Sequence, residues 1–128
     1  EAARGMSPFN LVVEGLGVFP NLKRLQVAWV GLGGELDKVS QLQQRIESNL
    51  VLLGFSAESR AFTPHLTLAR LRDRVLPDER ERFGRLIADT RFETVCTIKV
   101  AFVNLMGSQL TREGAIYNRL STVDLRGG

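Results

Sequence analysis

Cysteine is almost absent from this chain of 128 residues, which contains Cys96 alone. A single cysteine cannot form an internal disulfide, and no second cysteine or histidine stands at a metal-ligand spacing from it. We therefore interpret Cys96 as a small buried hydrophobic residue rather than as a nucleophile or a zinc ligand. The lack of disulfide-forming cysteines fits a reducing compartment, and we expect the protein in the cytoplasm.

Two further patterns are missing, a membrane-spanning run and a glycine-rich nucleotide-binding loop. No apolar run reaches the roughly 18 residues that a spanning helix needs, and the opening stretch EAARGMSPFN has no hydrophobic segment of the signal-peptide kind. The stretches GLGVF and GLGGEL match neither the P-loop nor the dinucleotide-binding fingerprint. We expect no membrane partner and no dinucleotide site, and we interpret both glycine stretches as turns.

Lysine is scarce as well, with Lys23, Lys38 and Lys99 the only lysines among 17 basic residues. Arginine supplies the remaining positive charge, and 14 acidic residues leave a net charge of +3 at pH 7. A guanidinium group makes paired hydrogen bonds to phosphate. The charge balance therefore favours an anionic partner such as RNA.

Alternation of apolar and polar residues predicts five strands. They cover residues 9–15, 25–32, 62–72, 92–106 and 115–125. In the first of them, Phe9, Leu11 and Val13 share one face. The stretches 15–21 and 107–114 are expected to be loops.

Two helices are predicted among these strands. Apolar residues at spacings of three and four run from 35 to 53, and Gly54 stands where a helix-ending glycine belongs. Pro77 opens a second helix, which carries Phe83, Leu86 and Ile87 on one side. This order of strands and helices predicts a single α+β domain over residues 1–128 with a mostly antiparallel sheet.

The only histidine, His65, lies in the stretch AFTPHLTLAR. In a strand His65 and Thr67 point the same way, and Leu66 and Leu68 point the other way, where we expect the helices. An imidazole can give or take a proton, and a threonine hydroxyl can donate to a phosphate oxygen. The pair indicates acid–base chemistry on a phosphate. The alternative is a structural histidine bonded to a backbone carbonyl.

The string FTPHLTLAR resembles the second H-x-T-x motif of the 2H phosphoesterases. It is most similar to that of the RNA 2′,3′-cyclic phosphodiesterases, long called 2′-5′ RNA ligases. The likeness covers nearly the whole chain. LVVEGLGVFPN with LQVAWVGL resembles the family's paired strands, LQQRIESNLVLLGF its helix before the motif, and VNLMGSQLTREGAIYNRLSTVDL its closing strands.

This resemblance implies a two-lobed α+β fold, with mostly antiparallel sheets and flanking helices around a central cleft. It implies that RNA 2′,3′-cyclic phosphate ends are opened to 2′-phosphates by two histidines, one acting as base and one as acid. The threonines of the two motifs hold the phosphate, and no metal or organic cofactor takes part. Some members also join or cleave 2′-5′ RNA linkages in vitro.

Carried over residue by residue, the resemblance makes His65 and Thr67 the catalytic residues. Arg70 is expected to hold the RNA phosphate, although it shares the parity of Leu66 and Leu68 and could point away. Phe62 and Tyr117 are candidates for lining the cleft or stacking on a base, with core packing as the alternative for both.

One departure from the family pattern stands out, because this chain has one H-x-T-x motif where the family has two. We expect that the chain lacks the N-terminal part with the first motif, and that it is inactive or feeble alone. The expected partners are RNA ends or cyclic nucleotides, with no obligate protein partner. The alternatives are a non-catalytic RNA-binding relative and a small cyclic-nucleotide phosphodiesterase.

Overall fold

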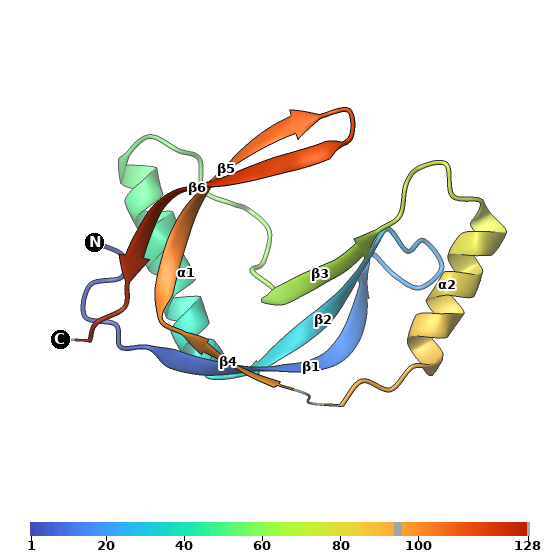
Figure 1. The fold of residues 1–128 in the computed structure, drawn as a ribbon, viewed down its shortest axis with the longest axis horizontal. Coiled ribbons are helices and arrows are strands. Elements are labelled where there is room, and N and C mark those ends of the chain that lie inside the picture. Colours follow the sequence, from blue (N-terminus) through green and yellow to red (C-terminus); the bar gives the residue numbers. More distant parts are fainter. Residues whose placement is uncertain (94–95, 128) are drawn as a thin grey trace. The chain divides into compact units, whose positions relative to one another are not determined.

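The computed structural model describes residues 1–93 and 96–127 and confirms the predicted α+β class with antiparallel strands (Figure 1). Its elements follow in the order β1 (Phe9–Phe19), β2 (Val27–Gly34), α1 (Leu36–Leu52), β3 (His65–Arg70), α2 (Pro77–Asp89), β4 (Cys96–Val100), β5 (Phe102–Thr111) and β6 (Gly114–Asp124).

The chain divides into two compact units. One comprises Glu1–Phe9, Ser40–Ser59 and Lys99–Gly128, and the other comprises Asn10–Val39 and Arg60–Ile98. The second unit contains nearly all of a four-stranded sheet with the strand order β3-β2-β1-β4. The first contains the two-stranded sheet of β5 and β6. That residues 1–128 form one domain stays a prediction.

The core of the four-stranded sheet consists mainly of apolar residues on β1 and β2, the strands that were predicted from the alternation of apolar and polar residues. Phe9, Leu11 and Val13 are buried along β1, as expected. On and just before β2, Leu25 is fully buried, and Ala28 and Val30 are nearly so. Burying a Leu or Val side chain stabilises a fold by about 1.5–3 kcal/mol, so this cluster is the main support of the sheet.

In this central pair β1 is longer than predicted and β2 is shifted by two residues, and the interpretation of the glycine stretches as turns is wrong. β1 continues to Phe19 through a bulge at Gly15, whose φ of +75° suits glycine. β2 continues through GLGG to Gly34. The bulge lets β1 absorb one extra residue without losing its pairing with β2.

Both helices are confirmed. Helix α1 ends at Leu52, and Gly54 follows it in the predicted place with a φ of +99°, while the Phe55 N–H donates to the Leu50 carbonyl over 3.1 Å. Helix α2 begins at Pro77. Its predicted apolar side is only partly correct, because Leu86 is 60% exposed. Of the two helices in the described part of the chain, neither has the length and apolar character to cross a membrane.

The predicted strand over 92–106 is two strands, broken at Ala101, whose carbonyl accepts a 2.8 Å hydrogen bond from the Leu125 N–H. Residues 94 and 95 of that prediction lie outside the described residues. The predicted loop 107–114 is also wrong, because β5 runs to Thr111 and pairs with β6 across a two-residue turn. Every residue of β6 is exposed.

Two burial predictions are wrong for one reason. Cys96 was expected to be buried and is exposed, and Leu66 and Leu68 are 43% and 59% exposed. Cys96 lies on β4 and the two leucines on β3, which are the edge strands of the four-stranded sheet. A residue on an edge strand has a neighbouring strand on one side only, so alternation alone overestimates its burial.

Candidate functional site

Strand β3 carries His65 and Thr67 on one face of the four-stranded sheet. In the pairing of β2 with β3, His65 lies opposite Gly31 and Thr67 lies opposite Trp29. Residues opposed across an antiparallel pair point to the same side. His65 and Thr67 thus share one face, as their spacing of two predicts. The pairing with β2 adds Trp29 to the same face.

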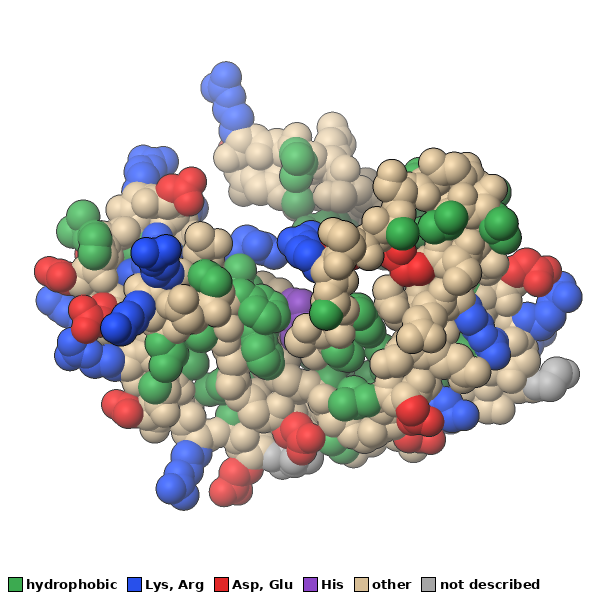
Figure 2. Space-filling view, turned by 180° about the vertical axis from the view of Figure 1, so that it is seen from behind, with side chains coloured by type: hydrophobic (Ala, Val, Ile, Leu, Met, Phe, Trp, Pro, Cys, Tyr) green, Lys and Arg blue, Asp and Glu red, His purple; other side chains and the backbone are tan. Residues whose placement is uncertain are grey.

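The imidazole of His65 is fixed through one of its nitrogens. Its Nδ1 lies 2.6 Å from the Thr63 carbonyl oxygen, and the residue is half-buried. A carbonyl oxygen can only accept, so this bond requires the proton on Nδ1 and leaves the lone pair of the neutral ring on Nε2. The backbone bond of the structural alternative is therefore present, yet it prepares Nε2 for proton transfer. Part of the histidine (purple) reaches the surface in Figure 2.

Two aromatic rings surround this imidazole, and no local pattern in the sequence indicated either of them. The ring centroid of Phe19 lies 5.2 Å from that of His65 in an edge-on arrangement, and that of Trp29 lies 5.9 Å away. Phe19 and Trp29 also contact each other, with centroids 5.2 Å apart. Such contacts restrict the ring to one orientation. Trp29 lies on a predicted strand and Phe19 in a stretch predicted to be a loop, and only the register of the strands places both rings beside β3.

Glycines on the same face make room for the tryptophan. The Trp29 ring lies directly over Gly17, where a Cβ atom would overlap two of its carbons. A Cβ at Gly31 would approach the Glu14 carbonyl oxygen to 2.6 Å. The Trp29 Nε1 atom is buried and has no hydrogen-bond partner in the described part of the chain. On the site face, the Trp29 ring therefore packs closely against a backbone surface that includes Gly17 and Gly31, and the Phe19 ring contacts Trp29.

Arg70 lies on the site face, which resolves the doubt about its parity. The pairing shifts between Ala28 and Trp29, so Leu68 has no residue opposite it and Arg70 lies opposite Val27. Val27 and Trp29 are two apart on β2 and share a face, so Arg70 joins Thr67 on that side. Its side chain is exposed at the end of β3.

The two remaining candidates are exposed side chains. Phe62 is 47% exposed and stands three residues before His65. Tyr117 is 66% exposed and lies on β6, opposite Ser108, in the other compact unit. Neither is packed in a core. A substrate role for either residue stays a prediction.

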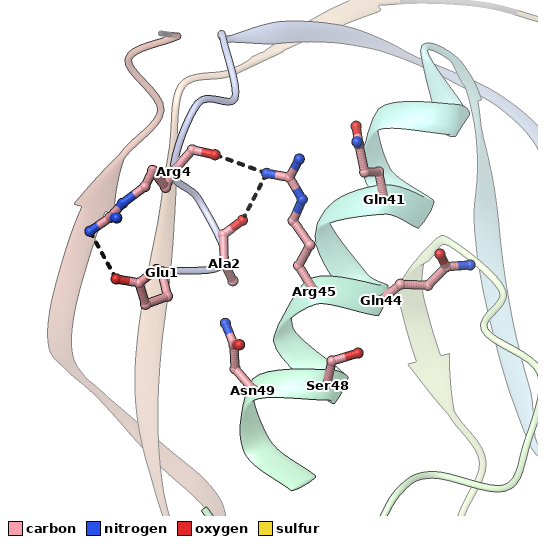
Figure 3. Close-up of a pocket in the computed structure, with 8 residues that line it drawn as sticks. All are labelled: Glu1, Ala2, Arg4, Gln41, Gln44, Arg45, Ser48 and Asn49. Atoms are coloured by element: carbon pink, nitrogen blue, oxygen red, sulfur yellow. Dashed lines mark hydrogen bonds and ion pairs between the residues drawn. The ribbon is translucent and has the colours of Figure 1, made fainter. Parts of the chain in front are cut away.

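A pocket of about 530 Å³ lies in the first unit, between the N-terminal segment and α1 (Figure 3). Amide and hydroxyl side chains of α1 line it, among them Gln41, Gln44 and Ser48. The Arg45 guanidinium turns toward the N-terminal segment and donates to the Arg4 carbonyl at 2.9 Å and to the Ala2 carbonyl at 3.4 Å. Arg45 therefore fastens α1 to this segment, and the pocket contains none of the predicted site residues.

No group of three or more histidine, cysteine, aspartate or glutamate side chains suited to a metal ion is found among residues 1–93 and 96–127.

Comparison with known proteins places this site in a family. A family model described as LigT-like phosphoesterase matches residues 31–117, which include β3 with its H-L-T-L sequence. The chain is 33% identical over 125 residues to the RNA 2′,3′-cyclic phosphodiesterase of Methanothermobacter thermautotrophicus, covering 98% of this chain and 65% of that protein. It is 36% identical over 116 residues to the protein of the same name from Aeropyrum pernix, covering 90% and 64%.

Two solved structures share the fold of this chain. The crystal structure of the protein TT0787 of Thermus thermophilus matches with a TM-score of 0.67 and 26% identity, covering 98% of this chain and 64% of that one. A crystal structure described as a phosphoesterase matches in fold with a TM-score of 0.66. The chain thus spans about two thirds of the length of the relatives that it matches.

Proposed function

Because the chain belongs to the LigT-like phosphoesterase family, we propose that it serves the hydrolysis of RNA 2′,3′-cyclic phosphate ends to 2′-phosphates. The names of two relatives over 30% identical support this substrate. The observation that carries the proposal is the hydrogen bond between His65 Nδ1 and the Thr63 carbonyl oxygen. This bond leaves Nε2 for proton transfer on the face that carries Thr67.

The proposed reaction exchanges one bond to phosphorus for another. A water oxygen bonds to phosphorus, the bond from phosphorus to the 3′ oxygen breaks, one proton leaves the water and one joins the 3′ oxygen. His65 can serve one of these two transfers at Nε2: the neutral ring can accept the first proton, or the protonated ring can donate the second. A positioned group of this kind contributes a factor of about 10²–10⁴ in rate. The Thr67 hydroxyl donates to a phosphate oxygen, and Arg70 offers its positive charge.

One histidine provides for only one of these two proton transfers. Groups that act as a pair lose most of their effect when either is missing. We therefore propose that the 128-residue chain alone turns over slowly or not at all, and that hydrolysis at full rate needs a second acid–base group. We propose that this chemistry uses neither a metal nor an organic cofactor.

The proposed substrate is a single-stranded RNA end. The exposed rings of Phe62 and Tyr117 suit stacking on unpaired bases, which is the usual mode of single-stranded RNA recognition. A 5′ hydroxyl that attacks phosphorus in place of water, with the bond from phosphorus to the 3′ oxygen breaking as before, would join two RNA ends through a 2′-5′ linkage. The free, exposed thiol of Cys96 supports a reducing compartment, and we place the protein in the cytoplasm.

The test is hydrolysis of 2′,3′-cyclic AMP and of an RNA with a cyclic phosphate end, each measured with and without EDTA. The chain is compared with His65→Ala and with Lys38→Ala, an exposed control outside the site. The proposal is supported if the unaltered chain and Lys38→Ala both form a 2′-phosphate and His65→Ala does not. Turnover unaffected by His65→Ala, or abolished by EDTA, contradicts it.

Two other outcomes point to the alternatives. Because the chain alone is expected to turn over slowly or not at all, the same assay is repeated on a chain extended with the N-terminal segment of a relative that carries an H-x-T-x motif. RNA binding that persists in His65→Ala, with no turnover even by the extended chain, would favour an RNA-binding relative. Turnover of the cyclic mononucleotide but not of the RNA would favour a small cyclic-nucleotide phosphodiesterase.

A further inference from the structure

A basic pocket of about 350 Å³ lies in the same compact unit as His65, beyond the end of β3. We define the basic pocket by its lining residues Lys23, Arg24, Gln26, Asp73, Pro77 and Arg80. They come from three segments that meet there, namely the connection from β1 to β2, the residues after β3 and the first turn of α2. No role of the basic pocket follows from the H-x-T-x chemistry.

The three segments are fastened to one another, so the basic pocket is preformed. The Arg80 guanidinium donates to the Leu25 carbonyl and, over 3.1 Å, to the Arg72 carbonyl. Helix α2 also approaches the connection closely at Gly84, where a Cβ atom would lie 2.5 Å from the Leu22 carbonyl oxygen. A fixed pocket binds a charged ligand without first having to order its own side chains and loops.

The charge of the basic pocket is positive. Lys23, Arg24 and Arg80 contribute three positive charges against one negative charge from Asp73. Neither Lys23 nor Arg24 is held in an ion pair within the described part of the chain. Asp78 and Glu79 add negative charge in the first turn of α2, and Glu81, whose pKa the charge of Lys23 also lowers, is paired with Arg85 at 2.9 Å. Two cations are therefore available to an anionic ligand.

The path from His65 to the basic pocket runs along β3. Arg70 is five residues beyond His65 on the same face, which corresponds to about 17 Å along a strand. The pairing continues past the strand, because the Leu71 N–H donates to the carbonyl of Gln26, a lining residue, over 2.8 Å. The order along the sheet is therefore His65, Thr67, Arg70 and then the basic pocket.

We infer that the basic pocket binds backbone phosphates of the RNA a few nucleotides from the cyclic end whose phosphate lies at His65. This inference rests on the proposed function and adds a second point of contact to it. Lys23 and Arg24 would neutralise phosphates, with Arg70 between the two sites. Contacts of this kind position the strand and carry no sequence preference. They also make affinity depend strongly on salt, because counterions leave the RNA on binding.

The experiment measures binding of a fluorescent single-stranded RNA with a cyclic phosphate end over a series of salt concentrations. The variant Lys23→Gln/Arg24→Gln is compared with Lys38→Gln/Arg82→Gln, which removes the same two charge types from exposed positions outside the basic pocket. We expect the first variant to bind about tenfold more weakly and the control to bind like the unaltered chain. We also expect the slope of log affinity against log salt to shrink by about 1.4, which is two phosphates at about 0.7 each.

A parallel measurement separates this inference from the proposed function. Hydrolysis of 2′,3′-cyclic AMP tests His65 alone, because a mononucleotide cannot reach the basic pocket, and the Lys23→Gln/Arg24→Gln variant should match the unaltered chain. Equal affinity and equal salt slope in the two double variants would overturn the inference, as would no RNA binding by the unaltered chain. Absence of hydrolysis by a chain supplied with the second acid–base group, together with a reduced salt slope of the Lys23→Gln/Arg24→Gln variant, would overturn only the proposed function.

Discussion

At the scale of single residues, the site depends on how one imidazole is held. The Thr63 carbonyl fixes the Nδ1 proton of His65, and Phe19 and Trp29 fix the plane of its ring. A general acid or base is effective only when its reacting nitrogen is aimed at the substrate, so these contacts serve function as well as packing. Trp29 is the only tryptophan of the chain and therefore reports on the site by its fluorescence.

Thr67→Val removes a hydroxyl while keeping nearly the same shape. We expect the dissociation constant for 2′,3′-cyclic AMP, measured by Trp29 fluorescence, to rise by a factor of about 10 to 100, because a hydrogen bond to a charged group is worth about 1.5–3 kcal/mol. The unfolding midpoint should stay unchanged, because the Thr67 side chain is exposed. Unchanged affinity in the folded variant would show that Thr67 does not hold the phosphate.

Gly17→Ala tests the close packing of Trp29 against the Gly17 backbone. The added methyl group would overlap the indole ring of Trp29. The ring must therefore move, and its contacts with Phe19 and His65 are disrupted. We expect a loss of about 1–3 kcal/mol in the free energy of unfolding and a shifted Trp29 emission maximum. Emission and stability that both match the unaltered chain would contradict the tight packing described here.

At the scale of elements, the position of α2 depends on the absence of a side chain at Gly84. Alanine favours a helix over glycine by about 1 kcal/mol, yet its Cβ atom would press on the Leu22 carbonyl. We expect Gly84→Ala to lower the free energy of unfolding by about 1–2 kcal/mol in chemical denaturation, because the displaced backbone outweighs the helix preference. Arg82→Ala, exposed on the same helix, is the control and should change it by less than about 0.5 kcal/mol. Stabilisation by Gly84→Ala would mean that α2 does not contact the connection.

The same helix carries an ion pair with a predictable pH dependence. The hydrogen bond from Arg85, together with its charge, lowers the pKa of Glu81 below its ordinary value. A carboxylate whose pKa is lowered by folding stabilises the fold above its unfolded pKa, and this contribution is lost as pH falls through the folded pKa. We expect Glu81→Gln to lower the unfolding midpoint slightly at neutral pH and not in acid. High salt should reduce the difference, because the pair is exposed.

At the scale of the whole molecule, the two sheets differ in how much of them is buried. Leu11, Val13 and Val30 are buried in the four-stranded sheet, whereas all of β6 is exposed and Leu110 of β5 is 85% exposed. A two-stranded hairpin is marginally stable in water by itself. The β5–β6 hairpin is therefore the less protected of the two sheets.

Amide hydrogen exchange checks this difference. We expect amides of residues 107–120 to exchange at least tenfold faster than those of residues 27–33, because local opening of the hairpin exposes little apolar surface. The measurement is exchange followed by mass spectrometry of peptides from each sheet. Equal protection of the two peptides would mean that the hairpin is covered in solution, and its dependence on protein concentration would identify a second copy as the cover.

Local sequence accounts for the features that depend on neighbours along the chain. Pro77 begins α2 and Gly54 ends α1, because a fixed φ and a missing Cβ atom act wherever they occur. The alternation of β1 and the shared face of His65 and Thr67 follow from the period of two in a strand. The family motif is likewise a local string, which is why it could be recognised in the sequence.

Tertiary structure alone decided the features that depend on register and on strand order. A bulge at Gly15 and an unopposed Leu68 determine which side chains of neighbouring strands share a face, and so bring Trp29 and Arg70 to the site. The exposure of Cys96 follows from its place on an edge strand. Pairing between segments far apart in the chain sets the register and the strand order, and no local pattern encodes either. The alternation of apolar and polar residues has the same period of two on an edge strand as in the centre of a sheet, so it cannot reveal that Cys96 is exposed.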